Sequence, residues 1–109
     1  MTGRAPLLGR SLAARLGPDT LRRLHAAHGP SFHLFNEARL QANVEAFVAA
    51  FGAIYPKIGI GHSYKTNYVP AVARAMAAAG AVPEVVSSME YALALRLGAA
   101  PASIIVNGP

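Results

Sequence analysis

Apolar residues recur at helical spacing in several segments of the chain, most clearly between Glu37 and Phe51. Asn36 precedes this segment and belongs to the residue types that favour a helix N-cap, and Gly52 follows it as a stop signal. The apolar residues of the segment share one helical face and are Leu40, Val44, Phe47, Val48 and Phe51. We therefore predict a helix over this segment, with that face buried.

Three shorter segments are also typical of helices. Proline suits the first helical turn and opens two of them, at residues 18–27 and 70–79, and a glycine follows each. Ser87 and Glu90 have the spacing of a capping box, in which the hydroxyl caps the helix and the carboxylate bonds back to the preceding backbone. We predict that this box starts a third helix, over residues 88–97.

Short runs rich in β-branched and aromatic residues lie between these helices. The predicted strands are Ser31–Phe35, Lys57–Lys65, Glu84–Ser87 and Ala102–Val106. Strands and helices alternate, which predicts the α/β class with a parallel sheet, either doubly wound or closed as a (β/α)₈ barrel. A barrel needs about 250 residues, and the sequence stops directly after a strand of buried type. We expect the chain to be a fragment of a longer protein.

The composition narrows the class of protein. The 109 residues are 53% hydrophobic and 14% charged, which favours a packed core over intrinsic disorder. The absence of cysteine excludes disulfides, thiol nucleophiles and thiolate metal sites, and nothing marks an oxidising compartment, so we expect a cytoplasmic protein. No apolar run approaches the roughly 20 residues of a spanning helix. The histidines lack ligand partners at metal-binding spacing, so no metal site is expected.

The net charge of +5 is concentrated at the start of the chain. Half of the basic residues lie in the first 23 positions: Arg4, Arg10, Arg15, Arg22 and Arg23. We interpret residues 1–29 as an arm with a helical turn near residues 11–16 and a short helix, and residues 30–109 as the domain proper. A transit peptide has a similar composition. A nucleic-acid-binding module is a further alternative, but the basic residues show no aromatic interleaving.

Lys65 is the first candidate for chemistry. It stands at the carboxyl end of a predicted strand, where α/β folds place their active sites. Burial there would disfavour the ammonium form and leave an amine able to attack a carbonyl and form a Schiff base. A surface lysine just past a strand end is the competing interpretation. His62 falls on the opposite face of the strand by two-residue alternation, and we interpret it as packed or solvent-facing.

The segments around Lys65 resemble a known family. Tyr64-Lys65-Thr66-Asn67, followed one β/α unit later by residues 84–91, resembles the fold-type III pyridoxal-phosphate decarboxylases of the diaminopimelate, ornithine and arginine group. In that family a Tyr-Ala-x-Lys-Ala-Asn segment carries the cofactor-binding lysine, and an Asp-x-x-Ser-x-x-Glu segment follows. The resemblance covers about residues 30–109, including Asn43, Gly80 and the Ile-Ile-x-x-Gly-Pro sequence at residues 104–109.

The resemblance implies a fold, a cofactor and a set of site residues. The chain would be the N-terminal part of an alanine-racemase-like (β/α)₈ barrel that decarboxylates an amino acid, with pyridoxal phosphate held as a Schiff base on Lys65. The implied cofactor-binding residues are Lys65, Asn67, Glu84, Ser87 and Glu90, with Lys65 also catalytic. The full protein would be a homodimer acting on a small amino acid, without nucleic-acid or membrane partners, and the fragment alone would be inactive.

Some positions depart from the family pattern. Thr66 and Glu84 stand where the family usually has Ala and Asp, and Ser88-Met89 replaces a common Gly-Gly pair. These changes suggest a side branch with its own substrate. Alanine racemases share the barrel, but residues 66–70 do not reproduce their Ala-Tyr-Gly-His-Gly pattern. A related racemase and a non-catalytic cofactor-binding barrel remain alternatives. For Ser87 and Glu90 a purely structural capping role is equally strong.

Overall fold

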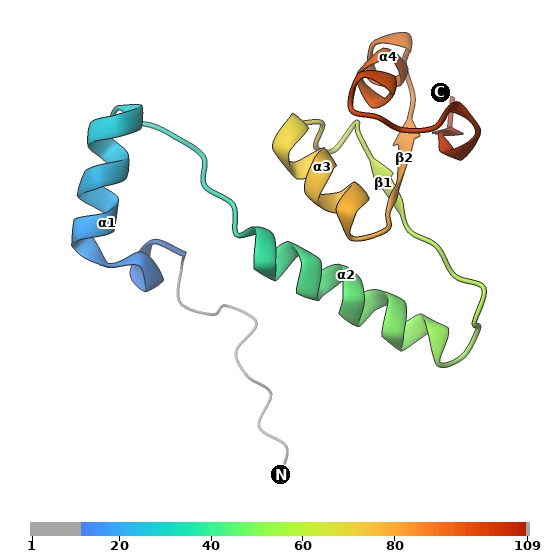
Figure 1. The fold of residues 1–109 in the computed structure, drawn as a ribbon, viewed down its shortest axis with the longest axis horizontal. Coiled ribbons are helices and arrows are strands. Elements are labelled where there is room, and N and C mark those ends of the chain that lie inside the picture. Colours follow the sequence, from blue (N-terminus) through green and yellow to red (C-terminus); the bar gives the residue numbers. More distant parts are fainter. Residues whose placement is uncertain (1–11, 109) are drawn as a thin grey trace. The chain divides into compact units, whose positions relative to one another are not determined.

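The computed structural model describes residues 12–108, with side chains from Arg15 onward (Figure 1). It divides into two compact units, Met1–Asn36 and Glu37–Pro109. Each unit is described by itself below.

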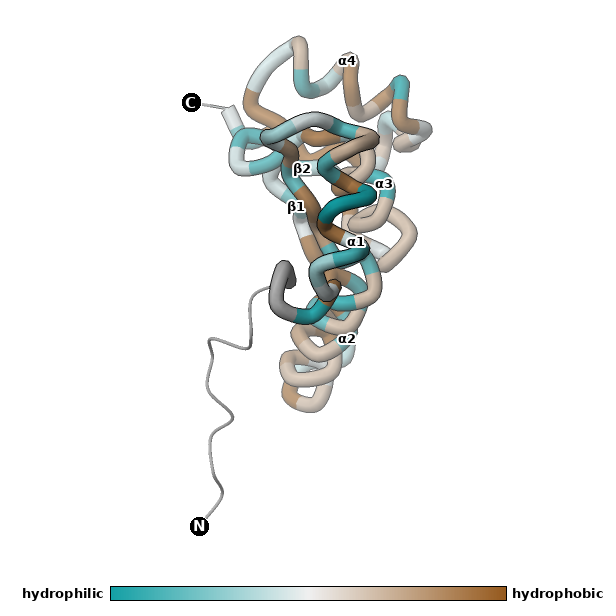
Figure 2. The backbone as a smooth tube through the Cα atoms, turned by 90° about the vertical axis from the view of Figure 1, so that its left-hand side faces the viewer, coloured by the Kyte–Doolittle hydropathy of each residue, from teal (hydrophilic) through white to brown (hydrophobic). Residues whose placement is uncertain are grey.

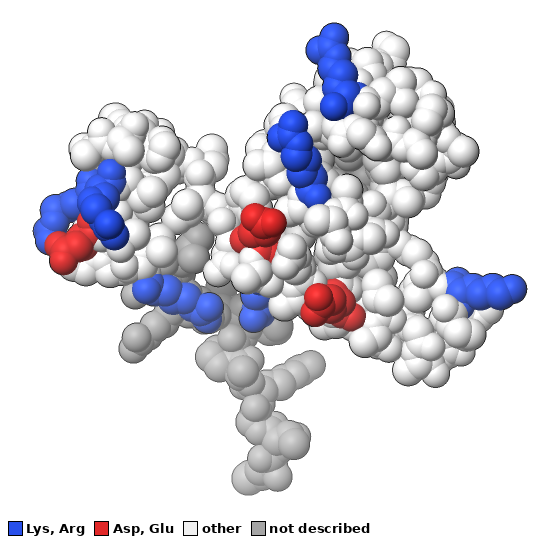
Figure 3. All heavy atoms as spheres, viewed as in Figure 1, with Lys and Arg blue, Asp and Glu red and all other residues white. Residues whose placement is uncertain are grey.

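The first unit contains one helical element, α1 (Leu12–His28). Gly17 breaks it with a φ of 74° and a ψ of 161°, a conformation that glycine reaches without strain, and Pro18 opens the second half. The predicted helical turn and short helix are therefore both confirmed from Leu12 on, and residues 1–11 of the predicted arm lie outside the described residues. The guanidinium of Arg22 pairs with the Asp19 carboxylate among the basic side chains of α1 (Figure 3).

The predicted strand at Ser31–Phe35 is wrong. Residues 31–36 form neither strand nor helix, and the side chains of Phe32, Leu34 and Phe35 are 37 to 44% exposed. Alternating residues indicate a strand only where a neighbouring strand can take up the backbone hydrogen bonds. Within residues 12–108, the sheet pairing involves other segments, so this stretch has no partner strand.

The second unit begins with α2 (Glu37–Gly52), at the predicted position. Figure 2 shows that α2 is apolar along much of its length. Of its predicted buried face, however, only Val44 is buried, whereas Phe47 and Phe51 are 48% and 50% exposed and stack on each other with ring centroids 4.6 Å apart. The predicted burial of the whole face is wrong because the described partner of α2 is the nine-residue helix α3 (Pro70–Ala78), which covers only part of it.

Three short parallel strands follow in the order β1-β2-β3. They are β1 (Gly61–Ser63), β2 (Val82–Val85) and β3 (Ile105–Val106). The register places Ser63 beside Glu84 and Glu84 beside Ile105. The predicted α/β class with a parallel sheet is confirmed, although the strands are shorter than predicted and the start of the last one forms a 3₁₀ turn, η1 (Pro101–Ser103).

The helices after β1 and β2 pack on the same face of this sheet. Tyr64 and Val85 point to that face and form a buried cluster with Ala73 of α3 and Ala94 of α4 (Ser88–Arg96). The small alanine side chains let both helices approach the strands closely. Alternation along the strands sends Ser63, Glu84 and Ile105 to the opposite face, and Ile105 is 46% exposed there. This second face is open in the described part of the chain.

Candidate active site

Lys65 lies in the turn that directly follows β1, at the carboxyl end of the sheet. The hydroxyl and the backbone N–H of Thr66 both donate to the Ser63 carbonyl, at 2.7 and 3.2 Å, and so fix the turn that presents the lysine. The side chain of Lys65 is exposed, which agrees with the interpretation of a surface lysine just past a strand end and not with a buried amine.

Glu84 is the carboxylate that the sheet brings close to Lys65. The Asn107 amide donates to Oε1 of Glu84 at 2.9 Å, from the residue directly after β3. Hydrogen bonds from the Ser63 hydroxyl and from Asn107 lower the pKa of Glu84, and the Lys65 charge lowers it further, against the opposing effect of partial burial. The Lys65 charge is the smallest of these influences on the pKa of Glu84, and the predicted pairing of the two residues at one site stays a prediction.

The other two predicted site residues, Ser87 and Glu90, form the predicted capping box of α4. Ser87 Oγ accepts from the Glu90 backbone N–H at 3.2 Å. The Glu90 carboxylate, which is 5% exposed, accepts from the Val86 backbone N–H at 2.7 Å, one residue earlier than in the usual box. Both side chains are engaged by the backbone that leads from β2 into α4, so the structural role of this pair is confirmed.

This arrangement predicts a sharp difference between two substitutions of Glu90. Glu90→Leu would leave the Val86 N–H without its acceptor, which costs about 1–3 kcal/mol of unfolding free energy. Glu90→Gln keeps an acceptor oxygen at the same reach and is expected to lose less than half as much. Urea unfolding of both variants checks this, and equal losses would contradict the role given to the hydrogen bond.

Asn67 serves the loop that leads into α3. Its Oδ1 accepts from the Val69 backbone N–H at 3.0 Å, just before Pro70 opens the helix. The backbone of Asn67 also hydrogen-bonds His62, whose ring lies 5.3 Å from the Tyr64 ring. Burial lowers the pKa of His62, and the bond to Asn67 raises it by less. His62 is half-buried, which agrees with the packed form of its interpretation as packed or solvent-facing.

The lowered pKa of His62 has a consequence for stability. A histidine with a folded-state pKa below its unfolded value of 6.5 favours the folded state only while it is neutral. The unfolding free energy is therefore expected to fall as the pH drops below about 6.5. His62→Asn should reduce this dependence. Urea titrations between pH 5 and pH 8 at about 0.1 M salt measure it.

Sequence reasoning missed Ser63 and Asn107, which both hydrogen-bond Glu84. Ser63 precedes Lys65 by two residues, so alternation could have placed it on the lysine's face of the strand. Asn107 lies 23 residues from Glu84 along the chain, and only the register of β2 against β3 brings the two together. No local pattern carries that information.

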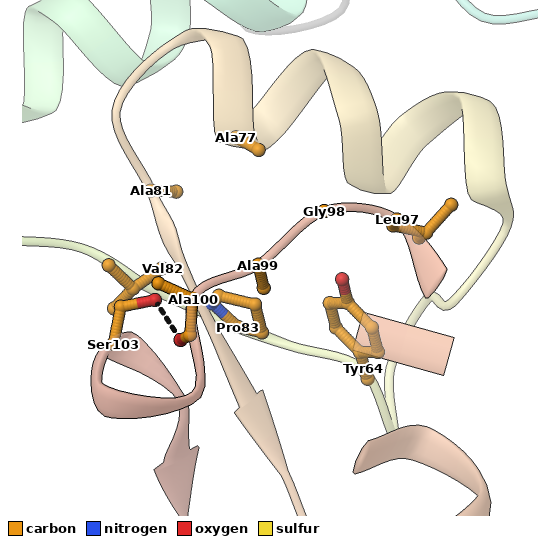
Figure 4. Close-up of a pocket in the computed structure, with 10 residues that line it drawn as sticks. All are labelled: Tyr64, Ala77, Ala81, Val82, Pro83, Leu97, Gly98, Ala99, Ala100 and Ser103. Atoms are coloured by element: carbon orange, nitrogen blue, oxygen red, sulfur yellow. Dashed lines mark hydrogen bonds between the residues drawn. The ribbon is translucent and has the colours of Figure 1, made fainter. Parts of the chain in front are cut away.

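Two hollows lie near the sheet. One of about 360 Å³ is at the carboxyl ends of β2 and β3, beside the start of α4, and is lined by Val85, Val86, Ser87, Ser88, Tyr91, Val106 and Gly108. The other, of about 230 Å³, lies on the helix-covered side between Tyr64 and the segment after α4 (Figure 4). Four of the ten residues that line it are alanines, and the Ser103 hydroxyl in it donates to the Ala100 carbonyl at 2.8 Å. The second hollow is away from the face that carries Lys65.

Comparison with known proteins does not extend this description: no protein-family model, curated protein or solved structure matches the chain. Among the described residues, no group of three His, Asp or Glu side chains is placed to hold a metal ion. No helix within residues 12–108 is long and apolar enough to cross a membrane.

Proposed function

We propose that this chain supplies the cofactor-holding lysine, Lys65, of a pyridoxal-phosphate-dependent amino-acid decarboxylase. One observation carries the proposal. Lys65 is exposed in the turn at the carboxyl end of a parallel strand, and its charge acts on the Glu84 carboxylate of the neighbouring strand. The Tyr64–Asn67 segment supplies the resemblance that points to this cofactor.

The chemistry of these residues suits the cofactor. An amine that is to bond an aldehyde must be reachable, and Lys65 is. The pyridoxal ring, when bound, acts as an electron sink for the carbanion left by decarboxylation. Glu84 would place a negative charge next to the lysine nitrogen and steer it once it is released. Asn67 and Ser87 hold the loops that flank this edge through backbone hydrogen bonds.

The topology supports a place for the chain among the first units of a (β/α)₈ barrel. The three strands are parallel and follow one another in sequence order, and both intervening helices contribute to the cluster on one face. In a barrel each helix lies outside its strands and the inner face holds layered side chains, and one half of a doubly wound sheet also carries its helices on a single face. In a barrel, the open face with Ser63 and Glu84 would be the inner side.

The test is borohydride trapping of the intact gene product after incubation with pyridoxal phosphate, followed by peptide mass mapping. We expect a pyridoxyl adduct on Lys65. An adduct elsewhere, or none on a folded protein, would overturn the proposal.

Product analysis then separates the reaction classes. Candidate amino acids labelled at the carboxyl carbon are expected to release labelled carbon dioxide. Inversion of the α-carbon without this release would assign the protein to the related racemases, and an adduct without turnover of any amino acid would indicate a non-catalytic cofactor-binding member.

A further inference from the structure

We propose that Ser63, Glu84 and Asn107 act as one positioning unit, in which the Ser63 hydroxyl and the Asn107 amide hold the Glu84 carboxylate beside Lys65. The inference rests on the proposed function and deepens it, because it assigns two residues outside the family motif to the site. Ser63 lies in β1 and Glu84 in β2, and Asn107 directly follows β3.

The backbone fixes the three residues relative to one another. Ser63 pairs with Glu84 in the register of β1 against β2, and the Tyr64 N–H donates to the Glu84 carbonyl at 2.9 Å. On the other side, the Asn107 backbone N–H donates to the Val85 carbonyl at 2.9 Å, so the residue that supplies the amide is itself tied to β2. The two donors thus approach Glu84 from the strands on either side of it.

The chemistry of the donors selects one form of Glu84. An amide NH₂ only donates, and the Ser63 hydroxyl can donate, so both suit an ionised carboxylate with its several acceptor positions. Among the described residues, the charge that acts on Glu84 from this face is Lys65. His62 lies on the opposite face of β1, and the Glu90 carboxylate is engaged by the Val86 N–H. The two donors therefore favour the ionised form of Glu84, and the Lys65 charge acts in the same direction.

The length of Glu84 makes such a unit necessary. Glutamate has one more rotatable bond than the aspartate usual at this position in the family that the chain resembles, so its carboxylate covers a wider range of positions. Donors on both sides restrict that range. A carboxylate fixed in this way would orient the lysine amine when the amine is free, whereas a mobile one would let the amine turn to solvent.

The unit can be tested without the cofactor by titrating the side-chain carboxyl of Glu84 by NMR in the ¹³C-labelled full chain. In the unsubstituted protein, the pH midpoint of the Glu84 titration is expected to lie below that of an ordinary glutamate. Ser63→Ala and Asn107→Leu should each raise the midpoint, and Ser63→Thr, which keeps the hydroxyl, should restore it. Backbone spectra of the variants report whether the fold is retained. Midpoints that do not move in either folded variant would overturn the unit.

A second readout tests its action on Lys65. The initial rate of pyridoxyl adduct formation is expected to fall on the order of tenfold in Ser63→Ala, as for loss of one hydrogen bond to a charged group, and to recover in Ser63→Thr. A raised Glu84 midpoint with an unchanged adduct rate would contradict a positioning role. If no adduct forms on Lys65 in any version of the chain, the proposed function fails, and the titration still decides whether the unit exists.

Discussion

Lys65→Ala is expected to abolish the borohydride-stable pyridoxyl adduct completely. The sequence contains only two lysines, Lys57 and Lys65, so the experiment has few sites to distinguish. Lys65 lies in the turn at the carboxyl edge of the sheet, where its charge acts on Glu84, whereas Lys57 lies four residues before β1 begins. If the adduct depends on the site and not on amine exposure alone, it should therefore be lost in Lys65→Ala. Absorbance of the reduced pyridoxyl group and peptide mass mapping measure it.

Lys57→Ala is the matched control, because Lys57 is also exposed and its loss removes the same charge. We expect this variant to form the adduct at the rate of the unsubstituted protein. Equal labelling of the two lysines in the unsubstituted chain, or an adduct that survives in Lys65→Ala, would reduce the reaction to nonspecific modification of surface amines.

The helices of this chain could be predicted from sequence because their signals are local. The break at Gly17-Pro18, the start of α3 at Pro70 and the Ser87–Glu90 box each depend on residues within one turn of one another. Backbone geometry and caps decide such boundaries without help from the rest of the fold. For the same reason, the position of Lys65 at a strand end was predicted correctly.

Burial and strand pairing depend on distant residues and were predicted less well. The apolar face of α2 was predicted to be buried, yet Phe47 and Phe51 remain half exposed. The alternating Ser31–Phe35 segment has no strand beside it in the described structure. Periodicity shows which face of a segment is apolar, but not what covers that face. The contact of Asn107 with Glu84 belongs to the same class, since it arises from the register between two strands.

Val85→Ala is expected to cost about 2 kcal/mol of unfolding free energy, because it removes two buried carbons and leaves a small cavity. Val85 is 1% exposed and is the largest of the fully buried side chains among the described residues. It lies between the strands and the alanines of α3 and α4, so little can move in to fill the gap. Such a loss is a large part of the stability of a typical domain.

Val106→Ala gives the control for this prediction at the neighbouring position of the sheet. Val106 pairs with Val85 in the parallel register but is 68% exposed, so the same change in chemistry is expected to cost less than about 0.5 kcal/mol. Urea unfolding followed by circular dichroism compares the two variants. Val85 packs β2 against the helices, and Glu84, the preceding residue of β2, faces the other way. The loss of stability in Val85→Ala should therefore also lower the yield of the pyridoxyl adduct at Lys65. Equal losses at both positions would mean that the cluster of Tyr64, Ala73, Val85 and Ala94 is not the core of this unit.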